Sequence, residues 1–136
     1  MKNFQPVLFW TSRIIAATIM AQTLYYKFSA SAESVYIFTT VGMEPWGRIG
    51  IGVFELIAAV LILIPSTVWL GSILAVGLMA GALGMHLTML GIDVNGDGGQ
   101  LFLYALVVLL CGIYAFWQSR KAIPAGIKKF LPSFFK

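Results

Sequence analysis

The sequence predicts an all-α fold: an integral membrane four-helix bundle with a short extra helix in the first outer loop. Apolar residues make up 60% of its 136 residues and charged residues only 10%, whereas a soluble domain carries about 25% charged residues. The apolar residues also gather in four stretches, each near the roughly 20 residues that cross a bilayer as a helix. Four strands could not close a membrane barrel, so helices are the expected form.

The chain is expected to form a single domain with four spans and a basic tail over residues 118–136. We expect the spans at residues 6–26, 47–64, 68–90 and 100–117. The first apolar stretch exceeds the about 7 to 15 residues of a signal-peptide core, which indicates a retained helix. Apolar residues near helical spacing over 31–38 predict a short surface helix that ends at Gly42. The short connection 65–67 makes the second and third spans an antiparallel hairpin.

The distribution of basic residues predicts the orientation. An even number of spans places both termini on one side of the membrane. The tails contain Lys2, Arg120, Lys121, Lys128, Lys129 and Lys136. The positive-inside rule therefore predicts a multi-pass protein of the cell membrane, specifically a bacterial inner membrane, with both termini in the cytoplasm.

Ionisable residues inside or at the ends of the spans are the strongest functional lead, because a charge in the membrane usually pairs or marks a functional site. They are Arg13, Lys27, Arg48, Glu55 and His86. A helix rises about 1.5 Å per residue, which places Arg13 roughly 10 Å and Glu55 roughly 13 Å from the inner ends of their helices. At this shared depth we predict a structural ion pair between Arg13 and Glu55.

The remaining ionisable residues lie nearer the outer surface and predict a ligand-binding pocket. Lys27 and Arg48 stand at the outer ends of the first two spans, and His86 stands about four residues inside the third. The expected pocket residues are Lys27, Arg48, Glu55, His86 and Tyr26. His86 can serve as a hydrogen-bonded structural residue, or it can carry protons or bind a polar head group.

Other motifs have simpler interpretations. His86 is the only histidine and Cys111 the only cysteine, so we expect no metal site and no disulfide within one chain. The segment 93–98 matches the start of a calcium-binding loop, but the position of the essential glutamate is Tyr104. A polar turn in which Asp97 or a neighbour caps the last helix is therefore favoured. No nucleophile with its base, phosphate loop or nucleic-acid surface is present, and no catalytic residue is assigned.

Small residues predict close packing between helices. The third span contains Gly77, Gly81 and Gly84, and the second opens with Gly47, Gly50 and Gly52. Such small-xxx-small patterns let helix backbones approach each other. The same glycine-rich faces could instead join copies of the chain in a homo-oligomer.

The chain resembles the DoxX-like family of small four-helix membrane proteins over nearly its whole length. The resemblance rests on Arg13 and Lys27 in the first span, on the segment 44–48 that leads to Glu55, and on His86 in the third span. It implies a role near quinone-dependent sulfur oxidation, in a membrane oxidoreductase complex, or, in a distant branch, in receptor assembly. Some relatives carry thiol pairs, which this chain lacks.

Three functions therefore stand as hypotheses. The leading one is an accessory subunit that binds a quinone or a lipid and serves a membrane redox partner; if the chain is part of an enzyme, it is a quinone-linked oxidoreductase subunit. The alternative is a non-catalytic scaffold or assembly chaperone for a membrane partner. The third is a small-molecule carrier, which four helices without an internal repeat make less favourable.

Overall fold

The computed structural model describes residues 4–133 and is helical, with no β-strand in that range. Its helices are α1 (Phe4–Phe28), α2 (Ala32–Thr40), α3 (Trp46–Leu63), α4 (Val68–Met85), α5 (Gln100–Ser119) and α6 (Ala125–Lys128). A π-helical turn, His86–Leu90, extends α4, and a 3-10 turn, Arg120–Ala122, extends α5. The predicted fold class is thus confirmed. Lys2 and Lys136, on which the predicted orientation partly depends, lie outside the described residues.

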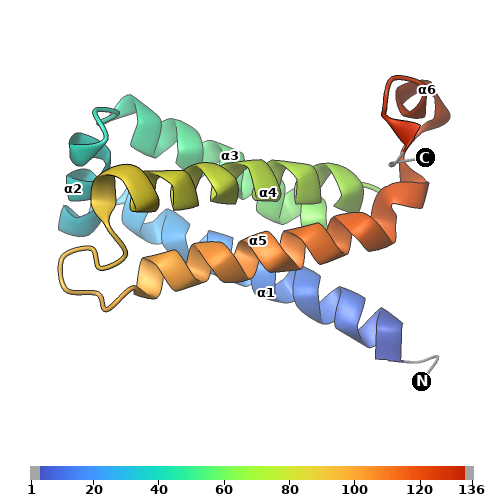
Figure 1. Ribbon diagram of the computed structural model, residues 1–136, viewed down its shortest axis with the longest axis horizontal. Coiled ribbons are helices and arrows are strands. Elements are labelled where there is room, and N and C mark those ends of the chain that lie inside the picture. The colour runs from blue at the N-terminus through green and yellow to red at the C-terminus, as the bar shows by residue number, and fades with distance from the viewer. Residues whose placement is uncertain (1–3, 134–136) are drawn as a thin grey trace.

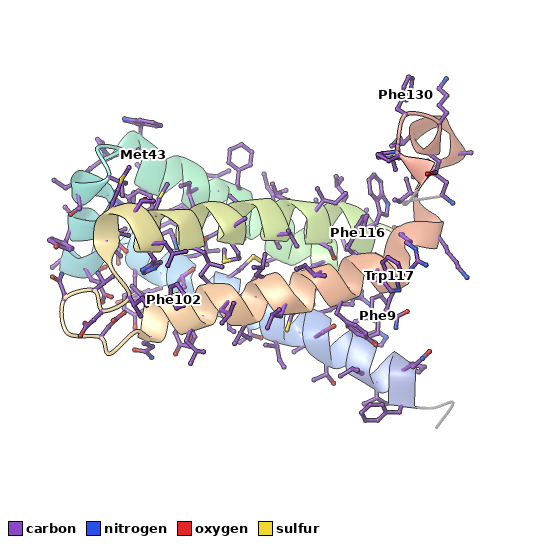
Figure 2. The ribbon with its side chains drawn as sticks, in the orientation of Figure 1. Phe9, Met43, Phe102, Phe116, Trp117 and Phe130 are labelled. Carbon is purple, nitrogen blue, oxygen red and sulfur yellow. The ribbon has the colours of Figure 1, made fainter. Side chains whose placement is uncertain are left out.

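Four helices are long and apolar enough to cross a membrane. They are Phe4–Phe28, Trp46–Leu63, Val68–Leu90 and Gln100–Ala122. Each is close to the predicted span, although the first begins two residues earlier and the last ends five residues later. Each added residue lengthens a helix by about 1.5 Å. Large apolar side chains project outward around the bundle (Figure 2), as a lipid-facing surface requires.

The four long helices pack as a closed ring. α3 packs against α1 and α4, and α5 packs against α4 and α1. Both ends of the chain lie at one end of the bundle, and α2 lies at the other with the loop 91–99 (Figure 1). We call these the terminal end and the loop end. Buried alanines line the helix contacts, including Ala16, Ala58, Ala75 and Ala115, because a small side chain lets two helices approach closely.

The connection between α3 and α4 is the predicted tight hairpin. The hydroxyl of Thr67 donates to the carbonyl of Leu61 over 2.8 Å and so satisfies an exposed helix end. A Cβ added to Gly71 would lie 2.5 Å from the backbone nitrogen of Ile62. Glycine at position 71 therefore allows the two helix backbones to touch just after the turn.

The short helix α2 also confirms a prediction. The hydroxyl of Ser31 accepts a hydrogen bond from the backbone N–H of Ser34 and caps the helix start. Gly42 follows the end of the helix with φ +76°, a conformation that favours glycine. α2 lies across the loop end of the bundle, beside the last turns of the third span (Figure 1).

Candidate functional site

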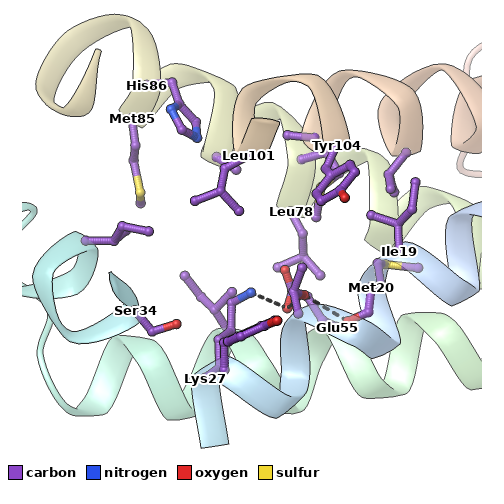
Figure 3. A pocket seen from close by; sticks show the side chains of 18 of the residues that line it. Ile19, Met20, Lys27, Ser34, Glu55, Leu78, Met85, His86, Leu101 and Tyr104 are labelled. Atoms are coloured by element: carbon purple, nitrogen blue, oxygen red, sulfur yellow. Dashed lines mark hydrogen bonds and ion pairs between the residues drawn. The ribbon is translucent and has the colours of Figure 1, made fainter. Parts of the chain in front are cut away.

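A buried ion pair joins α1 to α3 near the loop end. The ammonium of Lys27 lies 2.9 Å from Oε2 of Glu55, and both side chains are largely buried. The hydroxyl of Thr23, one turn before Lys27, lies 3.3 Å from the same oxygen. Figure 3 shows these contacts. Lys27 and Glu55 were both predicted as site residues, but their direct pairing was not.

The predicted ion pair between Arg13 and Glu55 is wrong. Arg13 instead donates from Nε to the carbonyl of Ile62 over 2.7 Å and from Nη2 to that of Leu63 over 2.8 Å. Its guanidinium also lies 3.8 Å from the centre of the Trp10 ring. Arg13 therefore caps the last turn of α3, where unpaired carbonyls and the negative end of the helix dipole favour a cation.

The direction of helix side chains explains the correction. Side chains on a helix lean toward its N-terminus. Because α1 and α3 run in opposite directions, Lys27 leans toward the middle of the bundle while Glu55 leans toward the loop end, so the two converge. Arg13 leans toward the terminal end, away from Glu55. Along α3, Glu55 is also about seven residues, or about 10 Å, from Ile62, beside which Arg13 lies.

Arg48 anchors the first turn of α3. Its Nε lies 3.0 Å from both carboxylate oxygens of Glu44, and its Nη1 donates to the backbone carbonyl of Lys27. The residue is buried. Arg48 contacts the backbone of Lys27 but does not line the cavity described next, unlike the other predicted pocket residues.

A partly open cavity of about 430 Å³ lies at the loop end, lined by α1, α2, α3, α4 with its π-helical turn, and α5. We call it the loop-end cavity. Its polar lining is formed by Gln22, Thr23, Tyr26, Lys27, Ser31, Glu33, Ser34, Glu55, His86, Gln100 and Tyr104. Its apolar lining includes Ile19, Met20, Ile37, Phe38, Leu78, Ala82, Met85, Leu101 and Val108.

Four of the five predicted pocket residues therefore border one cavity: Lys27, Glu55, His86 and Tyr26. Sequence reasoning missed Ser34 on α2 and Tyr104 on α5. Ser34 is buried, and its hydroxyl points into the cavity in Figure 3. Thr23 was also missed, although its position one helical turn before Lys27 places both on the same face of α1.

His86 lies across the cavity from the Lys27–Glu55 pair (Figure 3). Its Nδ1 is 2.9 Å from the carbonyl oxygen of Gly91. A carbonyl can only accept, so Nδ1 carries the hydrogen, and in the neutral ring Nε2 presents a lone pair. The edge of the Phe102 ring packs against His86, with ring centres 5.7 Å apart. Both contacts fix the orientation of the imidazole.

The π-helical turn positions His86. The backbone N–H of Gly91 donates to the carbonyl of His86 over 2.8 Å, which widens the helix by one residue. Gly91 then leaves the helix with φ +78°. The same two residues are thus joined twice, through backbone and through side chain, and the imidazole is held at the end of the third span.

The loop 91–99 is organised around Asp97. Its carboxylate accepts hydrogen bonds from the backbone N–H groups of Val94, Gly99 and Leu101 at 2.8 to 3.1 Å. Burial alone would raise the pKa of Asp97, but these hydrogen bonds outweigh it and hold the pKa below its usual value. The predicted polar turn that caps the last helix is confirmed.

The described residues contain no group of three or more histidine, cysteine, aspartate or glutamate side chains placed to hold a metal ion. Cys111 is half-buried and packs against the apolar core. No family model, curated protein or solved structure matches the chain. The loop-end cavity brings buried polar groups, among them Glu55 and His86, together with an apolar lining.

Proposed function

We propose that the loop-end cavity binds an amphipathic small molecule, a quinone or a lipid, and that the chain is an accessory subunit of a membrane redox system. The observation that carries the proposal is the meeting of a buried Lys27–Glu55 pair with an apolar wall in one cavity. Ligand sites have this composition: a mostly apolar lining with a few converging polar groups.

The size and depth of the cavity support an amphipathic ligand. Its volume of about 430 Å³ falls within the roughly 300 to 1,000 Å³ of typical ligand sites. The polar groups of Lys27, Glu55 and His86 suit a polar head, whereas Met20, Leu78 and Val108 lie toward the middle of their helices and suit an apolar tail. A water-soluble metabolite would leave these apolar side chains without a matching surface.

The redox part of the proposal draws on the resemblance to DoxX-like proteins. Arg13, Lys27, Glu55 and His86 carry that resemblance, and Lys27, Glu55 and His86 border the cavity. A neutral imidazole can accept a proton and a carboxylate can too, which suits a ligand that changes its protonation when it is oxidised or reduced. The redox chemistry itself would belong to the ligand and its partner protein.

A cavity-filling variant tests the binding site. Decylubiquinone, the same compound reduced to its quinol, and a short-chain phosphatidylethanolamine would be titrated separately into the protein in lipid nanodiscs, with binding followed by intrinsic tryptophan fluorescence and by mass spectrometry of the complex. Ala82→Phe should abolish saturable binding, because residue 82 borders the cavity. Ala80→Phe is the matched control, because residue 80 is on the same helix but exposed and outside the cavity lining.

The probes also separate the two ligand classes. Saturable binding of decylubiquinone, in its oxidised or its quinol form, that Ala82→Phe removes and Ala80→Phe leaves intact would support a quinone site, and the same pattern for the phospholipid would support a lipid site. If no probe binds saturably, or if both variants bind like the original protein, the loop-end cavity is not the ligand site and the scaffold hypothesis gains. Circular dichroism and gel filtration would verify that each variant is folded.

A further inference from the structure

The polar atoms in the loop-end cavity are not all used by the protein. Oε2 of Glu55 receives Lys27 and Thr23, but Oε1 has no hydrogen-bond partner within residues 4–133. Nδ1 of His86 is hydrogen-bonded to the carbonyl oxygen of Gly91, and Nε2 of His86 likewise has no partner among those residues. Glu55 is 4% exposed and His86 5%. Two buried side chains therefore each leave one atom available to a ligand.

We infer that the loop-end cavity selects an uncharged head group that carries hydroxyls, a phenol or a quinol, over a carbonyl, ether or anionic head. This inference rests on the proposed function, since it names the head group that the same cavity takes. It follows from three properties of the lining: its charge, its free acceptors and the position of its one ammonium group.

The charge of the lining disfavours an anion. The carboxylate and ammonium side chains that border the cavity are those of Lys27, Glu33 and Glu55, so one ammonium faces two carboxylates. The single ammonium is already paired with Glu55 at 2.9 Å. A phosphate or carboxylate would either share the Lys27 ammonium with Glu55, which brings two negative charges together in a buried site, or displace Glu55 and leave its carboxylate without a partner, and both are costly.

The free acceptors favour a donor. Oε1 of a carboxylate only accepts hydrogen bonds, and so does Nε2 of a neutral imidazole whose Nδ1 is protonated. A quinone carbonyl or an ether oxygen also only accepts, so it would leave both atoms unsatisfied in a buried site. A hydroxyl satisfies either atom by donating its hydrogen.

The ion pair adds a second reason. A hydroxyl oxygen can accept a hydrogen from the Lys27 ammonium while its own hydrogen goes to Glu55, so one group serves both partners. His86 stands across the cavity from this pair (Figure 3). A ring with hydroxyls on opposite sides, as in a quinol, presents one donor in each direction. The Ser34 hydroxyl, which also points into the cavity, supplies a further partner.

Three matched probes test the selectivity: 4-dodecylphenol, 4-dodecylanisole and 4-dodecylbenzoate share the ring and tail and differ in the head. Each would be titrated at neutral pH into the protein in phosphatidylcholine nanodiscs, with Ala82→Phe as the reference for partition into lipid. Hydrogen bonds to charged groups contribute enough that we expect the phenol to bind at least about tenfold more tightly than the anisole, with the benzoate weakest.

The outcomes are distinguishable. If no probe binds the original protein more strongly than Ala82→Phe, both the proposed function and this inference fail. If the anisole or the benzoate binds as tightly as the phenol, with Ala82→Phe abolishing all binding, only the head-group inference is overturned. In a supporting result, Glu55→Gln or His86→Phe also reduces the difference in binding affinity between the phenol and the anisole. The three-probe comparison on the original protein decides the matter even where a variant does not fold.

Discussion

Lys27 binds α3 twice. Its ammonium lies 2.9 Å from Glu55, and its backbone carbonyl accepts a hydrogen bond from Arg48, about two helical turns away along α3. The side chain and the main chain of one residue therefore fasten the end of α1 to two levels of the neighbouring helix. This double attachment fixes the wall of the loop-end cavity that carries its ion pair.

Removing one partner of the Lys27–Glu55 pair should destabilise the bundle. Lys27→Met or Glu55→Leu leaves the other charge buried and unpaired, and we expect a loss of about 3 to 5 kcal/mol in the free energy of unfolding. The double variant should recover much of this loss, since it leaves no buried charge. Unfolding in mixed micelles, followed by circular dichroism, measures all three. If the loss in the double variant equalled the sum of the losses in the two single variants, Lys27 and Glu55 would not interact.

Arg13→Lys should weaken the end of α3 although it keeps the charge. A lysine cannot donate to the carbonyls of Ile62 and Leu63 from two fixed nitrogens or stack on Trp10 as a guanidinium does. We expect a loss of about 1.5 to 3 kcal/mol in the free energy of unfolding.

Arg120→Lys is the matched control for Arg13→Lys. Its guanidinium also stacks on a tryptophan, Trp117, at 3.8 Å. Among the described residues it donates only to a carbonyl of its own helix, that of Trp117, and not to a neighbouring helix, and it is less buried than Arg13. This change should stay within about 0.5 kcal/mol, as surface substitutions usually do. Equal effects of the two substitutions, measured by the same unfolding assay, would contradict a capping role for Arg13.

Gly71→Ala should disrupt the α3–α4 hairpin. The added Cβ would lie 2.5 Å from the backbone nitrogen of Ile62, and neither backbone can move without separating the helices. We expect a cost of about 1 to 3 kcal/mol from overpacking. Gly50→Ala in α3 is the control, because nothing lies within 4 Å of its added Cβ. That change should be neutral or stabilising through higher helix propensity. The thermal unfolding temperature of Gly71→Ala should be lower than that of the original protein, and that of Gly50→Ala should be unchanged or higher.

Acid should loosen the loop before α5. The pKa of Asp97 lies below its usual value in the folded chain, chiefly because three backbone N–H groups overcome the effect of burial. Its stabilising contribution is therefore fully present above the ordinary carboxyl pKa of about 3.9 and is lost as the pH falls through the lower folded value. Hydrogen exchange at the amides of Gly99 and Leu101, measured across this range and divided by the intrinsic rate at each pH, should show a loss of protection at low pH.

Two substitutions isolate the contribution of Asp97. Asp97→Ala should lower the free energy of unfolding by about 1 kcal/mol at neutral pH, as loss of a helix-capping side chain does, and should remove the acid response of those amides. Asp93→Asn is the matched control, because Asp93 is exposed in the same loop and its side chain makes no hydrogen bond within residues 4–133. An unchanged acid response in Asp97→Ala would assign the effect to another group.

The number and extent of the long helices could be predicted because the apolar stretches are separated by polar or glycine-rich turns. The cavity was partly predictable, since Lys27, Glu55, His86 and Tyr26 all stand toward the same end of their helices. The ion-pair partner of Glu55, Lys27, could not be predicted in the same way. Depth counted from the ends of apolar stretches carries errors of several residues, and it ignores that side chains lean toward the helix N-terminus.

Arg48 and Ser34 show two other reasons for the differences. Arg48 was expected in the pocket, but Glu44, one turn earlier, takes its side chain instead. Ser34 was missed because hydropathy does not show that a serine lies on the face of a short surface helix that packs onto the bundle. The spacing of apolar residues does not predict the π-helical turn at His86, because this turn depends on the hydrogen bond from the backbone N–H of Gly91 to the carbonyl of His86.

α2 is the one wall of the loop-end cavity that does not belong to the ring of four long helices. Its first turn is capped by its own Ser31, and a glycine with positive φ follows its end. It packs onto that ring through its two buried side chains, Ser34 and Phe38. A substitution in α2 should therefore change the shape of the cavity while the contacts among α1, α3, α4 and α5 stay in place, so the binding space can vary without a change in the spanning bundle.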